Sequence, residues 1–350
     1  MFKMTRNIFD DGDASLRAKI AGTYSILLAL NFVAWGWTLI EFHGSPVLLG
    51  TAFLAFSFGL RHAVDADHIA AIDNVTRKLM QQGRRPVALG FFFSVGHSSI
   101  VILASLGVIL IAPGARESFE GIRDLGGMTG TLVSGLFLCA IAISNFAIFL
   151  STYRSFRQGT LADENLDRLL AQRGFVARIS RRLLNLISQS WQMLPLGFLF
   201  ALGFDTATEI AILGISASKL STGLPAATIM IFPMLFTAGM TLIDTTDGVL
   251  MLGAYGWAFQ NPNRKIMYNL CVTFVSVFIA ALVGGIELLS VLNDQMELRG
   301  SFWNVLTTMT SHFDMVGYGI IAFFIASWIV SFLILKMRDS NEIGSADVRT

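Results

Sequence analysis

The sequence predicts an all-α integral membrane protein with about eight transmembrane helices, and three observations support this fold class. Hydrophobic residues make up 54% of the 350 residues and charged residues only 14%, whereas soluble domains carry about 25% charge. The apolar residues gather in runs that are long enough to cross a bilayer as helices. Those runs are continuous and lack the polar–apolar alternation that membrane β-strands require.

Neither a nucleic-acid partner nor a disulfide framework is expected. The formal net charge is +1, and the charged residues are segregated by segment rather than gathered into one basic surface. The two cysteines, Cys139 and Cys271, both fall within predicted spans. Charged residues are scattered through residues 1–19 ahead of the first apolar run, so no cleavable signal is expected.

We expect one polytopic transmembrane domain over residues 1–350. Its predicted spans are residues 20–41, 46–72, 87–112, 130–151, 192–217, 225–254, 268–292 and 315–336. Pro86 marks the entry to the third span, and Pro233 is expected to kink the sixth, because proline removes a helical hydrogen bond. The second span is the least hydrophobic, since ionisable residues interrupt its second half.

One long polar connection, residues 152–190, joins the fourth and fifth spans. It is rich in arginine, and its apolar residues are spaced as on an amphipathic surface helix. Lysine and arginine favour the cytoplasmic side of a membrane. With both termini inside, twenty of these residues fall on the inner side and four on the outer side. The sequence therefore predicts cytoplasmic termini and a cytoplasmic loop over 152–190.

Two pairs of spans carry similar motifs. Residues 60–70 of the second span resemble residues 202–211 of the fifth with a one-residue gap, and residues 93–98 of the third resemble residues 236–241 of the sixth. Spans two and five run in opposite directions, as do spans three and six. The pattern therefore indicates two repeats of inverted topology, an architecture typical of secondary transporters with a midplane site.

The segment from Arg61 to His68 concentrates charge inside an apolar span. It reads Arg-His-Ala-Val-Asp-Ala-Asp-His and follows the apolar run of residues 46–60. Arg61, Asp65 and Asp67 together would cost about 8–10 kcal/mol if they faced lipid. These side chains are therefore expected to face a cavity, a partner or an ion.

Helical geometry places His62, Asp65 and His68 on one face of span two and Asp67 on the other side. In a regular helix the two histidines would lie roughly 9 Å apart along the axis, which is too far for one ion. A site that uses both requires span two to be bent or unwound near Ala66. Asp67 is expected either to bind the ion or to orient a ligating imidazole.

Imidazole and carboxylate without thiolate suit a borderline divalent metal such as Ni²⁺, Co²⁺ or Zn²⁺. The alternative is a buried His–Asp–Arg network that only holds helices together. The density of ionisable residues in this short segment favours the metal site. Carboxylates of spans five and six are expected to form a cation path or to pair with Arg61. Polar residues at a similar depth that could support the site are Asn31, Asp65, His97, Asp205, Glu209, Asp244 and Asp247.

Four segments together resemble a known family. Residues 61–69, Arg-His-Ala-Val-Asp-Ala-Asp-His-Ile, resemble the second-helix signature of the nickel/cobalt transporter (NiCoT) family, a His, four residues, then Asp-His. Residues 92–99, 202–210 and 236–248 resemble that family's third-helix motif and its two later motifs. Length, span number, cytoplasmic termini and the large central loop also match, so the resemblance covers essentially the whole chain.

This resemblance implies a high-affinity secondary transporter that imports Ni²⁺, and in some members Co²⁺, across the bacterial cytoplasmic (inner) membrane. His62, Asp67 and His68 match the family's essential residues and would bind the metal. Val64, where broader-specificity members tend to carry Phe, resembles together with Asn31 the nickel-selective branch. The metal ion would be a substrate rather than a cofactor, and the surrounding partner would be membrane lipid.

Two other functions compete with import. Efflux of the same metals would use the same site, but exporters often carry a His-rich cytoplasmic loop, and residues 151–190 contain no His. An intramembrane metalloenzyme is disfavoured because the chain lacks His-Glu-x-x-His and has only five histidines, so we expect no enzyme activity. No Gly-x-x-x-x-Gly-Lys-Ser/Thr loop is present, so no built-in ATP motor is expected. No ATPase subunit is evident from the sequence.

Overall fold

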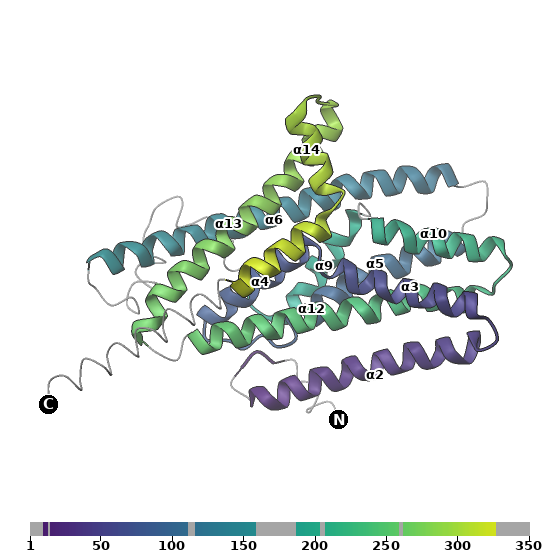
Figure 1. The fold of residues 1–350 in the computed structure, drawn as a ribbon, viewed down its shortest axis with the longest axis horizontal. Helices are drawn as coiled ribbons and strands as arrows, with labels where there is room; N and C mark the ends of the chain where they lie inside the picture. Colours follow the sequence, from purple (N-terminus) through teal and green to yellow (C-terminus); the bar gives the residue numbers. More distant parts are fainter. Residues whose placement is uncertain are drawn as a thin grey trace.

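Every regular element that the computed structural model describes is a helix (Figure 1). The structure describes residues 10–12, 15–110, 116–158, 187–203, 207–258 and 262–326. The all-α prediction is confirmed. The elements are α2 (Leu16–Phe42), α3 (Pro46–His62), α4 (Ala66–Gln81), α5 (Leu89–Leu110), α6 (Arg116–Gln158), η3 (Ser190–Gln192), α9 (Met193–Phe200), η4 (Ala201–Gly203), α10 (Ala207–Ser221), α11 (Ala226–Ile229), α12 (Ile231–Ala258), α13 (Pro262–Met296) and α14 (Ser301–Thr310), followed by a helix over Phe313–Ala326.

Several of these helices are long and apolar enough to cross a membrane. Within the described ranges five pass this test, or up to seven if each of two bent helix pairs is one span. Large apolar side chains also cover the outside, with Phe32 75%, Ile40 74% and Leu110 71% exposed. Such exposure suits lipid rather than water. The protein is therefore a multi-pass membrane protein, and the number of eight spans stays a prediction.

The predicted fifth and sixth spans are both interrupted. The fifth consists of α9, the 3-10 turn η4 and α10. In the sixth, α11 ends at Ile229 and α12 begins at Ile231, just before Pro233. Proline lacks an N–H and its ring crowds the carbonyl four residues earlier, here that of Ile229, which explains the interruption. Most of the predicted loop 152–190, including its amphipathic helix, lies outside the described residues.

Helices α3 and α12 cross at very close range. A Cβ atom placed on Gly59 of α3 would lie 2.0 Å from the carbonyl oxygen of Phe236 on α12. In the other direction, a Cβ on Gly239 of α12 would lie 2.6 Å from the carbonyl oxygen of Phe56. Only glycine allows the two backbones to approach this closely, as in the small-residue contacts typical of membrane helices.

Helices α5 and α9 cross in the same manner. A Cβ on Gly197 of α9 would lie 2.1 Å from the carbonyl oxygen of Phe93 on α5, and one on Gly96 of α5 would lie 1.9 Å from that of Leu194. The α5 residues of this crossing occupy the motif positions that match the α12 residues of the first crossing. This correspondence supports the inverted repeat, which stays a prediction.

A third close pair joins the two longest helices, α6 with 43 residues and α13 with 35. A Cβ on Gly284 of α13 would lie 2.9 Å from the carbonyl oxygen of Gly135 on α6. Next to this contact, buried Ser134 donates a hydrogen bond of 2.9 Å to Glu287. The pair flanks the bundle on the side of α4 (Figure 1).

Two apolar clusters pack on either side of a polar centre. One gathers buried side chains of α4, α5, α6, α9 and α13, and the other gathers those of α2, α3, α11 and α12. Between them lie buried polar residues from α3, α4, α5, α10 and α12. The fold therefore buries many ionisable side chains of these helices, among them the three histidines, inside the bundle and away from lipid.

Candidate metal centre

The two histidines of span two meet because the helix breaks between them. α3 ends at His62, α4 begins at Ala66, and the two helices are bent by 51° relative to each other. The two imidazole ring centroids therefore lie only 4.7 Å apart. The predicted bend near Ala66 is confirmed, and it removes the axial separation that a regular helix would impose on His62 and His68.

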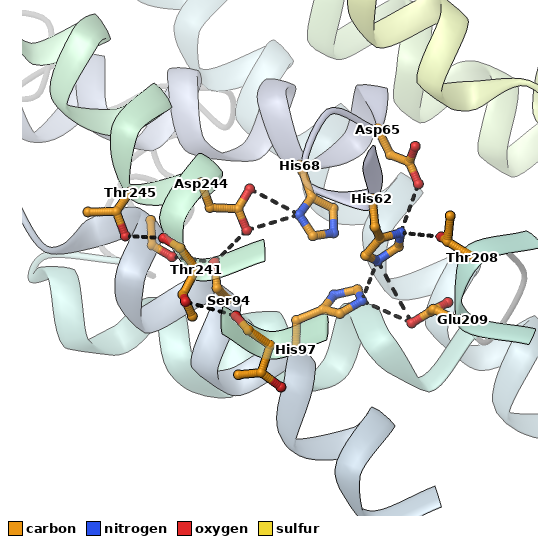
Figure 2. Close-up of polar contacts among 12 residues, drawn as sticks. His62, Asp65, His68, Ser94, His97, Thr208, Glu209, Thr241, Asp244 and Thr245 are labelled. Carbon is orange, nitrogen blue, oxygen red and sulfur yellow. Dashed lines mark hydrogen bonds and ion pairs between the residues drawn. The ribbon is translucent and has the colours of Figure 1, made fainter. Parts of the chain in front are cut away.

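His97 of α5 completes a cluster of three histidines (Figure 2). Its ring centroid lies 4.8 Å from that of His62 and 4.7 Å from that of His68. One ligand atom from each ring can be chosen so that all three lie within 4.8 Å of one another. The residues are 1%, 0% and 3% exposed for His62, His68 and His97. In the described part of the chain, no other three or more His, Cys, Asp or Glu side chains come together in this way.

Carboxylates lie beside the Nδ1 atoms of the span-two imidazoles. His62 Nδ1 is 2.9 Å from Asp65 Oδ2, and His68 Nδ1 is 3.2 Å from Asp244 Oδ2. Ser94 Oγ also donates a hydrogen bond to Asp244. If each Nδ1–H donates to its carboxylate, each Nε2 keeps a lone pair for a cation. This carboxylate–histidine arrangement is usual around protein-bound metals.

Two of the remaining ring nitrogens lie close to Glu209 of α10. His62 Nε2 and His97 Nε2 lie 2.8 Å apart, and Glu209 Oε1 lies 3.0 Å from the latter and 3.9 Å from the former. Two imidazole nitrogens at this distance share either a proton or a cation. His68 Nε2 is buried and has no hydrogen-bond partner among the described residues. The cluster thus offers three imidazole nitrogens to one ion, and the Glu209 carboxylate lies beside two of the three rings.

The surroundings favour a cation in a dry site. The ring of Phe93 lies 4.9 Å from that of His68, and the ring of Phe236 lies 5.5 Å from that of His62, measured between centroids. Water is thereby kept from two sides of the cluster, and charge interactions inside it are strengthened. His62 is also the last residue of α3, and the C-terminal end of a helix dipole attracts positive charge.

Two predicted residues of span two lie outside this cluster. Asp67, in the first turn of α4, is partly exposed and has no hydrogen bond or ion pair to any described residue. Asp65 and Asp244 contact the imidazoles instead, and metal binding by Asp67 stays a prediction. Val64 lies in the break itself, where a Cβ on Gly317 would come within 1.7 Å of its carbonyl oxygen.

Two of the other predicted residues, Asn31 and Asp247, lie on α2 and α12. Asn31 donates to the carbonyl oxygens of Leu27 and Ala238 at 2.9 and 3.3 Å, so it ties α2 to α12 rather than facing the histidines. Asp247 lies one turn after Asp244 on α12, and its Oδ2 atom is buried without a partner among the described residues. Asp205 lies outside the described residues.

Arg61 has a partner that the sequence did not indicate. The sequence offered the carboxylates of spans five and six as possible partners, but the guanidinium forms an ion pair of 2.7 Å with Asp314. Asp314 belongs to the helix that follows α14, more than 250 positions away in the chain. No local pattern links residues at this separation, so only the tertiary packing reveals the pair.

A bundle of membrane helices with a buried histidine–carboxylate centre defines a membrane protein for a transition-metal ion. Comparison with known proteins makes the assignment specific. The profile of the NicO family, described as "High-affinity nickel-transport protein", matches residues 48–334, and the chain belongs to this family. No solved structure matches the chain.

Characterised relatives cover nearly the same length. The chain is 50% identical over 349 residues to a "High-affinity nickel transport protein" of Cupriavidus necator, covering 98% of this chain and 99% of the relative. It is 45% identical to "Hydrogenase nickel incorporation protein HupN" of Bradyrhizobium diazoefficiens, covering 92% and 85%. It is 35% identical to "Cobalt transport protein NhlF" of Rhodococcus rhodochrous, covering 92% of both chains. These relatives are named for metal transport or incorporation, which points to a protein that is not an enzyme.

Proposed function

We propose that this protein imports Ni²⁺, with Co²⁺ as a second substrate, as a high-affinity secondary transporter of the bacterial inner membrane. The observation that carries the proposal is the cluster of His62, His68 and His97 at the break of span two. Its geometry gathers donors from three helices, α3, α4 and α5, at a depth where charged and polar groups are rare and usually functional. The metal is the substrate, and the protein needs no cofactor to bind it.

The donor set supports nickel and cobalt over harder ions. Three imidazole nitrogens and the Glu209 carboxylate suit Ni²⁺, Co²⁺ and Zn²⁺, whereas Mg²⁺ and Ca²⁺ prefer oxygen atoms only. Ni²⁺ binds such sites more tightly than Co²⁺, so a preference for nickel needs no special geometry. The names of the relatives point to the same two metals.

The inward direction and the orientation have separate support. The HupN relative is named for incorporating nickel into hydrogenase, which requires metal inside the cell. Three segments that the charge distribution assigns to the cytoplasm also meet at one end of the bundle. Asp11 accepts hydrogen bonds from Ser190 N and Oγ at 2.7 and 2.6 Å, and its carbonyl accepts one from Arg85 N at 3.0 Å. This meeting supports cytoplasmic placement of the N-terminus and of both loops.

Alternating access is the mechanism that this architecture favours. Discontinuous helices at the midplane of transporters supply ion ligands from their broken ends, and rocking of one repeat against the other exposes the site to each side in turn. Here the break in span two supplies two histidines, and the interrupted fifth span supplies Glu209. The paired glycine crossings of α3 with α12 and α5 with α9 support two such matched halves.

Uptake of labelled nickel by energised cells tests the proposal. We expect the variants His62→Ala and His68→Asn to lose uptake at submicromolar nickel, because each removes one imidazole from the cluster. His43→Ala and His312→Ala are matched controls, since both histidines are exposed at helix ends, and they should retain uptake. Near-wild-type uptake by His68→Asn would rule out the cluster as the transport site.

The same cells separate import from efflux. Expression of an importer raises the cellular nickel content at a fixed external concentration, whereas expression of an exporter lowers it. We expect a rise, and cobalt added in excess should compete with labelled nickel if both metals share the cluster. A fall in cellular nickel would overturn the inward direction while leaving the metal site intact.

A further inference from the structure

A second group of buried polar side chains lies along α4 and α12, beyond the three histidines. We call Asp73, Arg77 and Tyr255, together with Asp247 of α12, which lies close enough to Asp73 for their charges to interact, the Asp73 cluster. Tyr255 donates a hydrogen bond to Asp73 Oδ1, which joins the two helices. Asp73, Arg77 and Tyr255 are each at most 3% exposed. Neighbouring polar residues that extend the cluster are Asn74, Asn145 and Ser276.

The cluster contains more unpaired polar atoms than a structural network should. Asp73 Oδ2, Asp247 Oδ2, and both Nε and Nη1 of Arg77 are buried without a hydrogen-bond partner among the described residues. Arg77 uses only Nη2, which donates to Asn74 at 3.2 Å. Arg77 and Asp73 compensate each other's charge, but buried polar atoms without a hydrogen-bond partner still cost about 1–3 kcal/mol each. Such a group therefore requires water or an ion among its members.

The cluster lies between the histidines and one end of the bundle. Along α4, Asp73 is about 7.5 Å and Arg77 about 13.5 Å beyond His68. Helix α12 follows the same direction, because His68 contacts Asp244, and a Cβ on Gly248 one turn later would lie 3.5 Å from Ile72. The end toward which both helices run is the one where the Asp11 segment meets the loop after α4.

We propose that the Asp73 cluster is a second cation site, where a partly hydrated divalent metal ion pauses between the three histidines and the cytoplasm. This inference rests on the proposed nickel import and identifies the site that the ion would reach after it leaves the three histidines. Its ligands are the carboxylate oxygens of Asp73 and Asp247, the Tyr255 hydroxyl and water.

Oxygen donors would allow this site to release the metal ion toward the cytoplasm. They bind Ni²⁺ and Co²⁺ more weakly than imidazole nitrogen does, and a transported ion must meet sites that are weak enough to leave. The fixed positive charge of Arg77 compensates the two carboxylates when no metal is bound. It also repels an arriving cation, which shortens the stay of the ion in the cluster.

Metal binding by the purified full-length protein in lipid nanodiscs tests the site. Titration with Ni²⁺, and separately with Co²⁺, should give a tight event at the histidines and a weaker event at the Asp73 cluster. The double variant Asp73→Asn/Asp247→Asn should lose the weaker event and keep the tight one. Its maximal uptake rate in cells should fall at least ~10-fold, the lower end of the loss typical for disturbed metal sites.

Matched variants make the result decisive. Glu287→Gln removes another buried carboxylate, far along the α6–α13 pair, and should keep both binding events. Arg77→Gln should strengthen the weaker event and slow uptake, and Arg77→Lys should restore wild-type behaviour. If the double variant does not fold, Tyr255→Phe takes its place in the titration, and it should likewise lose the weaker binding event.

The possible failures are distinguishable. A wild-type protein with only the tight event, or a double variant that keeps the weaker event or the full uptake rate, would overturn the second site and leave water as the occupant of the cluster. Failure of the import proposal has a different signature, because expression of the wild type would then lower the cellular nickel content while both binding events remain.

Discussion

The close crossing of α3 and α12 predicts that any side chain added at Gly59 forces the two helices apart. In Gly59→Ala the new methyl carbon would lie 2.0 Å from the carbonyl oxygen of Phe236, and 2.8 and 2.9 Å from two more backbone atoms of that residue. No side-chain rotation relieves this overlap, because every atom in conflict belongs to the backbone. The helices must therefore move apart.

The required movement sets the size of the effect. Ordinary contact begins near 3.4 Å, so α3 and α12 must separate by about 1.4 Å. Overpacking of this kind costs about 1–3 kcal/mol in stability. His62 lies one turn after Gly59, so the same shift displaces its ring from the other two imidazoles. Because a site held 1 Å too loosely loses much of its function, we expect uptake at submicromolar nickel to fall at least ~10-fold.

Gly50→Ala is the matched control, because a Cβ at Gly50 of the same helix meets nothing within 4 Å. We expect its thermal unfolding temperature in detergent and its labelled-nickel uptake to match or slightly exceed those of the wild type. Gly59→Ala should unfold at a lower temperature and lose uptake. If Gly59→Ala and Gly50→Ala behave alike in both assays, the close crossing of α3 and α12 is refuted.

Three further predictions address the site, the break and the cytoplasmic end. Asp244→Asn should weaken nickel binding by ~10–100-fold in a titration, because it removes the charge that orients His68; unchanged affinity would contradict this role. Arg61→Asp should reduce uptake, and the added change Asp314→Arg should partly restore it. The Arg61–Asp314 ion pair itself contributes only about 0.2–1 kcal/mol to the stability of the fold, because the Arg61 side chain is 44% exposed. Burial raises the pKa of the Asp11 carboxyl, despite its hydrogen bonds and nearby cations. Its ionisation therefore costs folding free energy, and that cost disappears as the pH falls below the raised pKa. As the pH falls through this interval, the unfolding temperature of the wild type should therefore rise relative to that of Asp11→Asn.

The sequence predicted the structure best where the alternative arrangements would cost a large free energy. Charges between Arg61 and His68 cannot face lipid, so a site in span two followed from the cost of burying them. The two histidine positions are incompatible with one ion on a straight helix, so the bend near Ala66 also followed. Both inferences depend on one segment only, which is why a single sequence sufficed.

The rest of the site depends on which helices are neighbours. Helical periodicity tells which residues share a face, but it does not tell which helix that face meets. His97, Glu209 and Asp244 appeared as polar residues at the right depth, and only packing shows that they converge on the span-two imidazoles. For Asp67 the helical periodicity predicted a position opposite the histidines, and the structure gives its side chain no hydrogen bond or ion pair with a described residue.

The length of α6 has a mechanical consequence. At 1.5 Å per residue its 43 residues extend about 65 Å, roughly twice the ~30 Å thickness of the hydrocarbon core. Its far end at Arg157 is exposed and lies about 33 Å from the contact of Gly135 with Gly284. A tilt of about 5° at that contact would move the end by about 3 Å. A displacement of that size, outside the membrane, is large enough to be measured with a spin label at Arg157.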